Sequence, residues 1–243
     1  MAFLDSIHPE RQIDGFSKLS GTLTFYAFVR AIMLRQGVRN VLDYGAGCGA
    51  FYNDREALSI HLRDLRFNGA HVCACDIDHA VKSHPCSHEQ IVLQTGEALP
   101  FGDAAFDLIL SDMVFEHITN PPFVASELLR VLKPGGYICA RTPNKYGYIA
   151  MVARLIPNSR HLSVLKRVQP SRKPNQVFPT VYRMNTPGQI RRLFRPCELY
   201  CFTISGEPAY YFGSVFLYRA LLLLHRLLPP YLAPTLCLFI RKP

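Results

Sequence analysis

The sequence of 243 residues has no stretch of the roughly 18 to 20 uninterrupted apolar residues that span a bilayer. Charged residues make up only 19% of the chain, and no segment is compositionally simple or repeated. With 49% hydrophobic residues, the chain has ample material for a folded core. These features argue against a membrane-spanning protein and against bulk disorder.

Acidic residues are missing from one long segment. Between Glu127 and Glu198 there is no Asp or Glu, whereas the same segment holds 14 of the 27 Lys and Arg residues. The other 13 basic residues are outnumbered by all 18 acidic ones, so the net charge of +9 comes from this segment. One side of the protein should therefore attract anions.

None of the eight cysteines forms a CxxC pair, and several lie in apolar runs. This usage indicates reduced thiols in a cytosolic compartment. The segment 84–88 (HPCSH) is a weak metal candidate, but its proline and short spacing fit a polar turn better, so we expect no metal. Asp5, Glu10 and Arg11 interrupt the N-terminal region, which does not resemble a signal peptide.

Short apolar runs predict strands, and helical spacing or capping signals predict helices between them. The expected strands are residues 38–44, 70–75, 90–94, 106–111, 137–141, 198–205 and 235–241, and the expected helices are 22–36, 50–67, 123–132 and 186–194. Continuous apolar strands that alternate with helices indicate a parallel sheet covered on both faces. We therefore expect an α/β fold.

A glycine-rich turn after the first strand is the main candidate site. Gly45, Gly47 and Gly49 permit positive φ and close approach of a ligand to the backbone, although such a triplet also loosely fits a dinucleotide fingerprint. Asp43 favours a ligand with a sulfonium or ammonium charge and would repel a pyrophosphate. Asp76, at the end of the second strand, can accept two hydrogen bonds from a ribose diol.

At these positions the sequence resembles the class I S-adenosylmethionine-dependent methyltransferases, of the methyltransferase type 11 kind. The matching segments, in family order, are 41–49 (VLDYGAGCG), 97–101 (EALPF), 106–108 (FDL), 116–117 (EH), 132–136 (LKPGG) and 142–144 (TPN). The resemblance covers residues 38–145, with a weaker match at 182–194. It implies a Rossmann-like, doubly wound seven-stranded sheet, mostly parallel, whose last two strands form an antiparallel hairpin.

The resemblance also implies which residues bind S-adenosyl-L-methionine. The expected set is Asp43, Gly45, Ala46, Gly47 and Gly49 at the methionine and ribose portion, Asp76 at the ribose hydroxyls, Ile77 at the adenine, and Ser111 and Asp112 beside the methyl group. Thr95 stands where family members usually have an Asp that contacts the adenine amino group. This departure leaves Thr95, Gly96 and Glu97 as alternative partners for the adenine.

Two residues are candidates for roles at the reacting centre. His117, just past the fourth strand, is a candidate general base for a hydroxyl acceptor, because histidine titrates in the right range. The alternative is that Glu116 and His117 only shape the floor of the pocket. Tyr26 is a candidate lid that touches cofactor and substrate, and a core position is equally compatible with the sequence.

Two features point to the substrate. The basic segment suits phosphates, sugar acids or anionic lipid headgroups, and its candidate substrate residues are Arg154, Lys166, Arg167, Arg172 and Lys173. Residues 210–234 are strongly apolar, and residues 214–228 within them are helical in character, but Arg219, His225 and Arg226 disfavour a membrane span. This piece is suited to a membrane surface, to a substrate wall, or to packing on the sheet or in a dimer.

We expect one methyltransferase domain over residues 1–243. Its parts are an N-terminal lid or helix (1–37), a cofactor-binding core (38–145), a basic substrate-side segment (146–196), and the last two strands with an apolar insertion (197–243, insertion 210–234). The whole pattern is similar to uncharacterised bacterial methyltransferases associated with surface-polysaccharide synthesis. We expect a cytoplasmic protein, in possible peripheral contact with the inner membrane face; the sequence does not indicate an oligomeric state.

The expected reaction is O-methylation of an anionic or lipid-linked glycan or a comparable small acceptor. Alternatives are a quinone or lipid methyltransferase, a nucleic-acid methyltransferase, a non-catalytic cofactor-binding module and an NAD-linked oxidoreductase. Nucleic acid is the less favoured partner. Residues 120–123 (NPPF) resemble a base-flipping turn, but their context fits the start of a helix better.

Overall fold

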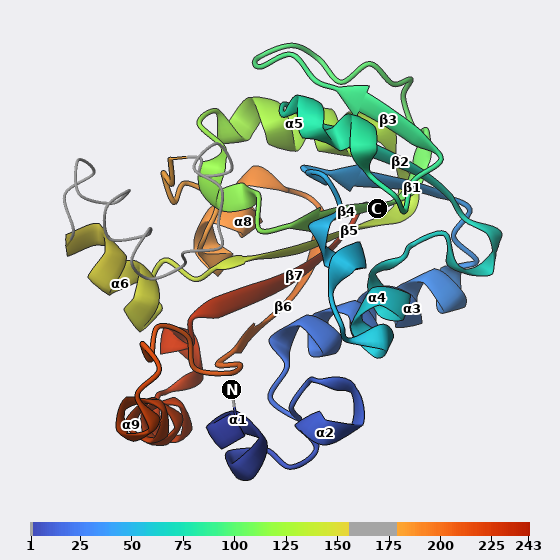
Figure 1. The fold of residues 1–243 in the computed structure, drawn as a ribbon. Coiled ribbons are helices and arrows are strands. Elements are labelled where there is room, and N and C mark those ends of the chain that lie inside the picture. Colours follow the sequence, from blue (N-terminus) through green and yellow to red (C-terminus); the bar gives the residue numbers. More distant parts are fainter. Residues whose placement is uncertain (1, 156–178) are drawn as a thin grey trace.

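The computed structural model describes residues 2–155 and 179–243 and contains a seven-stranded sheet (Figure 1). The strands, in the spatial order β3-β2-β1-β4-β5-β7-β6, are β1 (Asn40–Tyr44), β2 (His71–Asp76), β3 (Glu89–Val92), β4 (Phe106–Asp112), β5 (Leu132–Pro143), β6 (Glu198–Ile204) and β7 (Thr235–Arg241). Strands β1 to β5 pair in parallel, and β7 is antiparallel to both β5 and β6. The expected fold class is confirmed.

Helices cover both faces of the sheet, with α5 and α8 on one side and α3 and α4 on the other (Figure 1). The helices are α1 (Ala2–Ile7), α2 (Arg11–Asp14), α3 (Gly21–Gln36), α4 (Ala57–Arg63), α5 (Pro121–Val131), α6 (Tyr148–Leu155), α8 (Pro187–Leu193) and α9 (Val215–Leu227), with short 3-10 segments η1 (Ala50–Asn53), η2 (Phe67–Gly69), η3 (His79–Ser83), η4 (Phe115–His117) and η6 (Pro230–Leu232). Among the described residues, no helix has the length and apolar character needed to cross a membrane.

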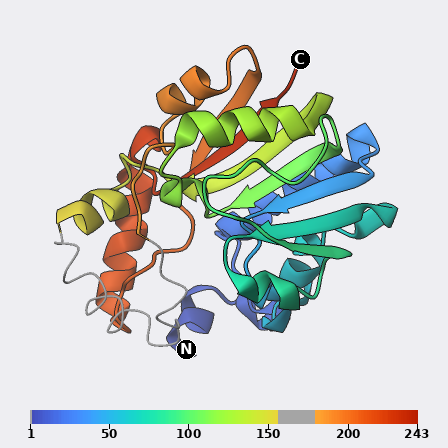
Figure 2. The same cartoon turned by 90° about the horizontal axis from the view of Figure 1, so that it is seen from above.

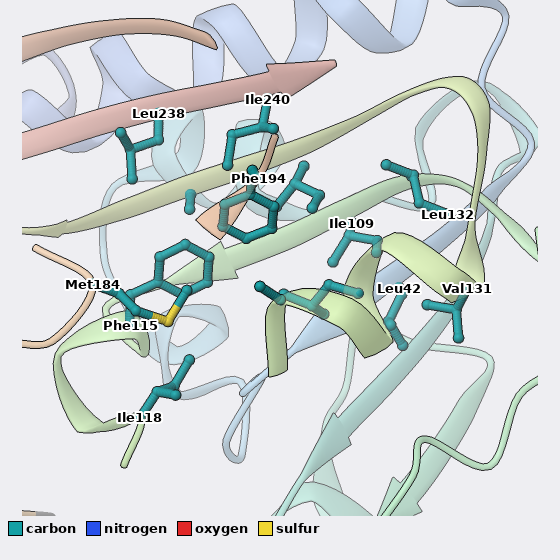
Figure 3. Packing of buried hydrophobic residues seen from close by; sticks show 14 of the residues in the cluster. Leu42, Ile109, Phe115, Ile118, Val131, Leu132, Met184, Phe194, Leu238 and Ile240 are labelled. Atoms are coloured by element: carbon teal, nitrogen blue, oxygen red, sulfur yellow. The ribbon is translucent and has the colours of Figure 1, made fainter. Parts of the chain in front are cut away.

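Each face of the sheet has its own apolar core. Leu42, Ile109, Leu238 and Ile240 of the sheet share one core with Val131 of α5 and Phe194, which follows α8 (Figure 3). The opposite core joins Phe25, Val29 and Met33 of α3 to Val41, Leu108 and Phe239. Leu108 and Ile109 are neighbours in β4 and both are 0% exposed, because successive side chains point to opposite faces of a strand. This double burial explains why the strands are apolar without alternation.

Local capping interactions stabilise several helix ends. The Ser20 side chain accepts a hydrogen bond from the Leu23 amide at the start of α3, and Gly37 ends this helix with φ 60°. Thr186 caps α8 in the same way, with Pro187 in the first turn. Residues 120–123 open α5 with proline in its first turn, as expected for an ordinary helix start.

The helix predicted over residues 50–67 is wrong. The chain instead forms η1, becomes extended at Asp54 (φ −66°, ψ 160°), and then forms the short helix α4. Distant side chains stabilise both ends of α4. The Asp14 carboxylate accepts hydrogen bonds from the amides of Ala57 (2.9 Å) and Leu58 (2.7 Å).

At the other end of α4, the Arg30 guanidinium donates to the carbonyl oxygens of His61, Leu62 and Asp64. Helix ends leave such backbone groups unpaired unless something else bonds to them. A local sequence pattern cannot reveal partners that lie far away in the chain, so the break in this helix could not be predicted.

Candidate active site

A cavity of about 580 Å³ lies where β1, β2 and β4 end, at the edge of the sheet that binds ligands in such folds. Most of the predicted cofactor residues line this cofactor cavity: Gly45, Ala46, Gly47, Gly49, Asp76, Ile77, Thr95, Gly96, Glu97 and Asp112. His117 lines it as well. The structure thus brings together residues from four separate turns of the chain.

The three loop glycines all have positive φ, at 78° for Gly45, 57° for Gly47 and 65° for Gly49, but they face different surroundings. A Cβ atom on Gly45 would lie 2.3 Å from Val114 Cγ2, and one on Gly49 would lie 2.7 Å from Pro85 Cδ. A Cβ atom on Gly47 would meet nothing within 4 Å. Gly45 and Gly49 are therefore required for packing, while Gly47 borders a hollow that a ligand can fill.

Asp76 holds this loop in place. Its Oδ2 accepts a hydrogen bond from the Gly47 amide at 2.8 Å, and its Oδ1 accepts one from the Asp78 amide at 2.9 Å. Each carboxylate oxygen can accept a second hydrogen bond. Asp76 can thus fix the loop and still accept two bonds from a diol in the cavity.

Asp43 lies beneath the loop, 9% exposed, and is not part of the cavity wall. Burial, and next the nearby Asp112 carboxylate, raise the pKa of Asp43 to about 7. His84 Nε2 lies 3.9 Å from Asp43 Oδ2. A cation bound above this carboxyl group would favour its ionised form, because opposite charges stabilise each other.

Asp112 forms one wall of the cavity and is held by two partners. Arg141 binds it through two bonds, Nε to Oδ1 at 2.7 Å and a terminal nitrogen to Oδ2 at 2.8 Å. The Tyr26 hydroxyl donates to Asp112 Oδ2 at 3.1 Å. Tyr26 is 3% exposed and does not line the cavity, so the structure places the candidate lid residue in the core.

Ser111 does not reach the cofactor cavity, although the resemblance placed it beside the methyl group. Its side chain is 0% exposed, and its hydroxyl has no hydrogen-bond partner in the described part of the chain. Side chains alternate along β4, so Ser111 points to the opposite face of the sheet from Asp112, which lines the cavity.

The hydrogen bonding of His117 shows which of its two ring nitrogens carries the proton. Its Nδ1 lies 3.0 Å from the Pro179 carbonyl oxygen, which can only accept, so Nδ1 carries the proton. In the neutral ring Nε2 is then the basic nitrogen, and it lies 3.8 Å from Glu116 Oε1. Burial raises the pKa of Glu116, whose Oε2 accepts a hydrogen bond from the Thr142 hydroxyl at 2.9 Å.

Sequence reasoning missed Arg63 and Met113, which also line the cavity. Arg63 belongs to α4, and its guanidinium carbon lies 4.3 Å from the Phe51 ring centroid. Because a continuous helix over residues 50–67 was expected, the direction in which the Arg63 side chain points could not be predicted. Met113 follows β4 with φ 61° and is 44% exposed. A methionine in this left-handed conformation is uncommon, and no sequence signal indicates it.

A second cavity, of about 340 Å³, adjoins the first, and Arg63 lines both. Its wall contains three arginines and three carboxylates, together with two hydroxyl groups at the start of α3: Arg11, Arg63, Arg141, Asp54, Glu56, Glu207, Ser20 and Thr22. Arg11 lies 3.3 Å from Glu207, and Arg63 lies 3.6 Å from Asp54. The charges on this polar cavity are therefore balanced.

The structure does not test the predicted basic substrate residues. Lys166, Arg167, Arg172 and Lys173 lie outside the described residues. Arg154 falls within α6, but only its backbone is described. A role for this segment in substrate binding stays a prediction.

Comparison with known proteins finds similarity over the central part of the chain. Residues 42–140 match the family described as a methyltransferase domain. An "uncharacterized methyltransferase" of Mycobacterium marinum is 33% identical over 98 residues, which are 40% of this chain and 36% of the relative. The bifunctional biotin biosynthesis protein BioHC of Cellvibrio japonicus is 32% identical over 130 residues, 51% of this chain and 24% of that protein. The chain thus spans about a third or less of the length of these relatives.

Solved structures with the same fold include the plantazolicin methyltransferase BpumL in complex with SAH, at 15% identity and TM-score 0.52, with 91% of this chain and 83% of that one covered. The [4+2]-cyclase SpnF is also similar, at 18% identity and TM-score 0.51, with 90% and 81% covered. These likenesses concern the fold alone, which can serve more than one activity. The family match over residues 42–140 and the seven-stranded fold thus make this chain similar to the class I S-adenosylmethionine-dependent methyltransferases.

Proposed function

We propose that this protein transfers the methyl group of S-adenosylmethionine to a hydroxyl of a sugar-like acceptor, as in an anionic or lipid-linked glycan. The observation that carries this proposal is the polar cavity that adjoins the cofactor cavity and shares Arg63 with it. A methyl donor and an acceptor must meet in line with water excluded, and two adjoining cavities suit such an encounter.

The residues of the first cavity fit the cofactor. The hollow at Gly47 leaves space for a ligand against the backbone, and Asp76 can accept hydrogen bonds from a ribose diol. The Asp112 carboxylate on the cavity wall and the buried Asp43 carboxyl group behind it suit a cationic ligand. When bound, S-adenosylmethionine supplies an electrophilic methyl group; the protein supplies position and charge.

The residues of the second cavity fit a hydroxyl-rich ligand. Guanidinium groups only donate hydrogen bonds and carboxylates only accept them, whereas a sugar hydroxyl does both. Arg11 and Arg63 stand beside Glu207 and Asp54, so the wall offers both kinds of group at close spacing. Because the opposite charges balance, this wall favours a polyhydroxylated ring over a bare anion.

A binding experiment tests the cofactor assignment. We expect S-adenosylmethionine to bind in calorimetry and NAD not to bind, and we expect Asp76→Ala to abolish tight cofactor binding while the protein stays folded. Asp76→Asn keeps an oxygen that can accept from the loop amide and should retain more affinity than alanine. Binding of NAD in place of S-adenosylmethionine would refute the assignment.

The acceptor is tested with a labelled methyl group. Transfer from isotopically labelled S-adenosylmethionine is measured with methyl glycosides, sugar nucleotides, quinols and short oligonucleotides as acceptors. Label in a base-stable ether on a sugar supports the proposal. Label found only in a quinol or a nucleobase overturns it in favour of that class.

We further propose His117 as the general base that takes the acceptor's proton through Nε2. A positioned base typically contributes roughly 10²- to 10⁴-fold in rate. His117→Gln should lower kcat by that order and remove a pH-dependent limb from the kcat profile, while cofactor affinity stays unchanged. His79→Gln, at an exposed histidine of η3, is the matched control. An unaltered pH profile in His117→Gln would assign His117 a purely structural role.

A further inference from the structure

We propose that the outer face of α9, together with the loop before it, docks on the surface of an anionic lipid bilayer. This docking surface consists of Phe212, Phe216, Arg219, Leu223, Arg226 and Leu227. The proposal does not rest on the methyl-transfer reaction, since docking is measured without turnover. It does agree with an acceptor that is linked to a lipid.

The inner face of α9 is held by polar contacts. Tyr218 is 1% exposed, and its hydroxyl lies 2.8 Å from His8 Nε2. Seven residues further along α9, His225 Nε2 lies 2.8 Å from the Tyr148 hydroxyl, and His225 Nδ1 donates to the Gly206 carbonyl at 3.1 Å. Residues seven apart share one side of a helix, so these contacts fix which side of α9 faces inward.

The outer face of α9 is apolar and exposed. Phe216 is 83% exposed, Leu223 57% and Leu227 72%, and their spacing of seven and four residues places them along one side of the helix. An ordinary surface helix turns polar residues to the solvent, whereas this side of α9 turns apolar residues to it. Figure 1 shows α9 at the periphery of the molecule, near α1, and Figure 2 also shows it at the periphery. An exposed apolar face of this kind marks an interaction site.

The loop before α9 extends the same surface. Phe212 is 70% exposed and has φ 50°, and Tyr210 has φ 61°. The left-handed conformation is unfavourable for aromatic residues and persists only when neighbouring structure enforces it. Tyr211 provides that anchor, because its ring packs edge-on against Tyr218 at 5.0 Å and Phe3 at 5.8 Å.

Charge selects an anionic bilayer as the occupant. Arg219 and Arg226 are exposed on α9, and no acidic residue occurs from residue 208 to residue 243. Arginines beside an apolar helix face add electrostatic attraction to anionic headgroups. At 13 residues, α9 is shorter than the roughly 20 residues that span a bilayer, so it would lie in the plane of the interface.

The absence of tryptophan makes a direct test possible. Phe216→Trp places a single reporter on the docking surface, and Leu34→Trp places a matched reporter on α3, where Leu34 is 57% exposed. Each protein is mixed with vesicles of phosphatidylcholine alone or with 30% phosphatidylglycerol. We expect the tryptophan emission of Phe216→Trp to shift to the blue with the anionic vesicles, and we expect no shift for the control.

Co-sedimentation with the same vesicles, using protein that carries neither tryptophan substitution, completes the test. Phe216→Ser with Leu227→Ser should lower binding to anionic vesicles at least tenfold, and Arg219→Gln with Arg226→Gln should remove the preference for anionic lipid. Unchanged S-adenosylmethionine binding in each variant shows that the fold is intact.

Three outcomes would overturn the proposal. The first is no emission shift with anionic vesicles. The second is an equal shift in the Leu34→Trp control, which would indicate that the protein adsorbs to vesicles without using the docking surface. The third is a shift without vesicles that grows with protein concentration, which would assign this face to a second copy of the chain.

Discussion

At the scale of single residues, substitution of Gly47 should affect ligand binding, whereas substitution of Gly45 should affect packing. Gly47→Ala adds a methyl group that meets no atom within 4 Å, so it should cost only about 1 kcal/mol of stability while lowering S-adenosylmethionine affinity at least tenfold. Gly45→Ala should instead destabilise the fold, because its Cβ would lie 2.3 Å from Val114. Thermal denaturation and calorimetry distinguish the two effects. Normal affinity in Gly47→Ala would show that the hollow is not part of the cofactor site.

The raised pKa of Asp43 predicts a pH-dependent stability. Folded Asp43 keeps its proton up to a pKa of about 7, whereas an unfolded Asp loses it near about 3.9. The folded state therefore binds more protons between these values, and the free energy of unfolding falls as pH rises through them. The slope is at most about 1.4 kcal/mol per pH unit, or about 4 kcal/mol in all.

Asp43→Asn lacks this titration, and urea denaturation of both proteins from pH 4.5 to pH 8.5 measures it. The stability difference, wild type minus variant, should decline with rising pH and level off above the folded pKa. Other groups, including His84 and Asp112, are common to both proteins and largely cancel. A difference that does not vary with pH would mean that Asp43 is already ionised in the folded cavity.

At the level of elements, the first turn of α4 depends on a distant carboxylate, that of Asp14. Asp14→Ala removes the acceptor for the Ala57 and Leu58 amides and should destabilise the protein by about 1 kcal/mol, as loss of a helix cap does. Asp14→Asn should cost less, because its amide oxygen still accepts. Urea denaturation gives the values.

Asp103→Ala is the matched control for Asp14→Ala. Asp103 bonds to Arg130, but its side chain is 81% exposed and Arg130 keeps Glu127 as a partner. A loss from Asp14→Ala no greater than that from the control would mean that water replaces Asp14 at this helix end.

Features with a local sequence signal could be predicted, and features that depend on distant residues could not. The strands and the loop glycines were predictable because burial on both faces and positive φ leave local marks in the sequence. Asp76 was predictable because it lies at a strand end. Arg63 and the break before α4 were not, because they depend on Asp14 and Arg30, which contact α4 only in the folded chain. Ser111 was misplaced because a shift of one residue along a strand reverses the side on which a side chain points.

For the molecule as a whole, thiol reactivity should report both the fold and the cofactor site. Cys73, Cys75, Cys86, Cys139 and Cys237 are buried, and Cys48, Cys197 and Cys201 are partly exposed. Burial raises the pKa of Cys73 to about 12 and that of Cys86 to about 11, which suppresses the reactive thiolate. Ellman's reagent at pH 8 should therefore react rapidly with at most three thiols in the native protein and with all eight after unfolding.

Cofactor should protect one of the three partly exposed thiols. Cys48 lines the cofactor cavity, so saturating SAH should slow its reaction and leave Cys197 and Cys201 unchanged. Peptide mapping of the labelled protein identifies each site. Rapid labelling of four or more thiols in the native protein would contradict the described packing.

The placement of β7 between β5 and β6 has a consequence for biosynthesis. β6 pairs with the sheet only through β7, which follows it in the chain. As the nascent polypeptide leaves the ribosome, residues 198–204 emerge before the strand that will receive them, and β5 keeps an open edge meanwhile. Open edges invite pairing with other chains. Until residues 235–241 arrive, β5 therefore has no partner on the side that β7 occupies in the folded protein.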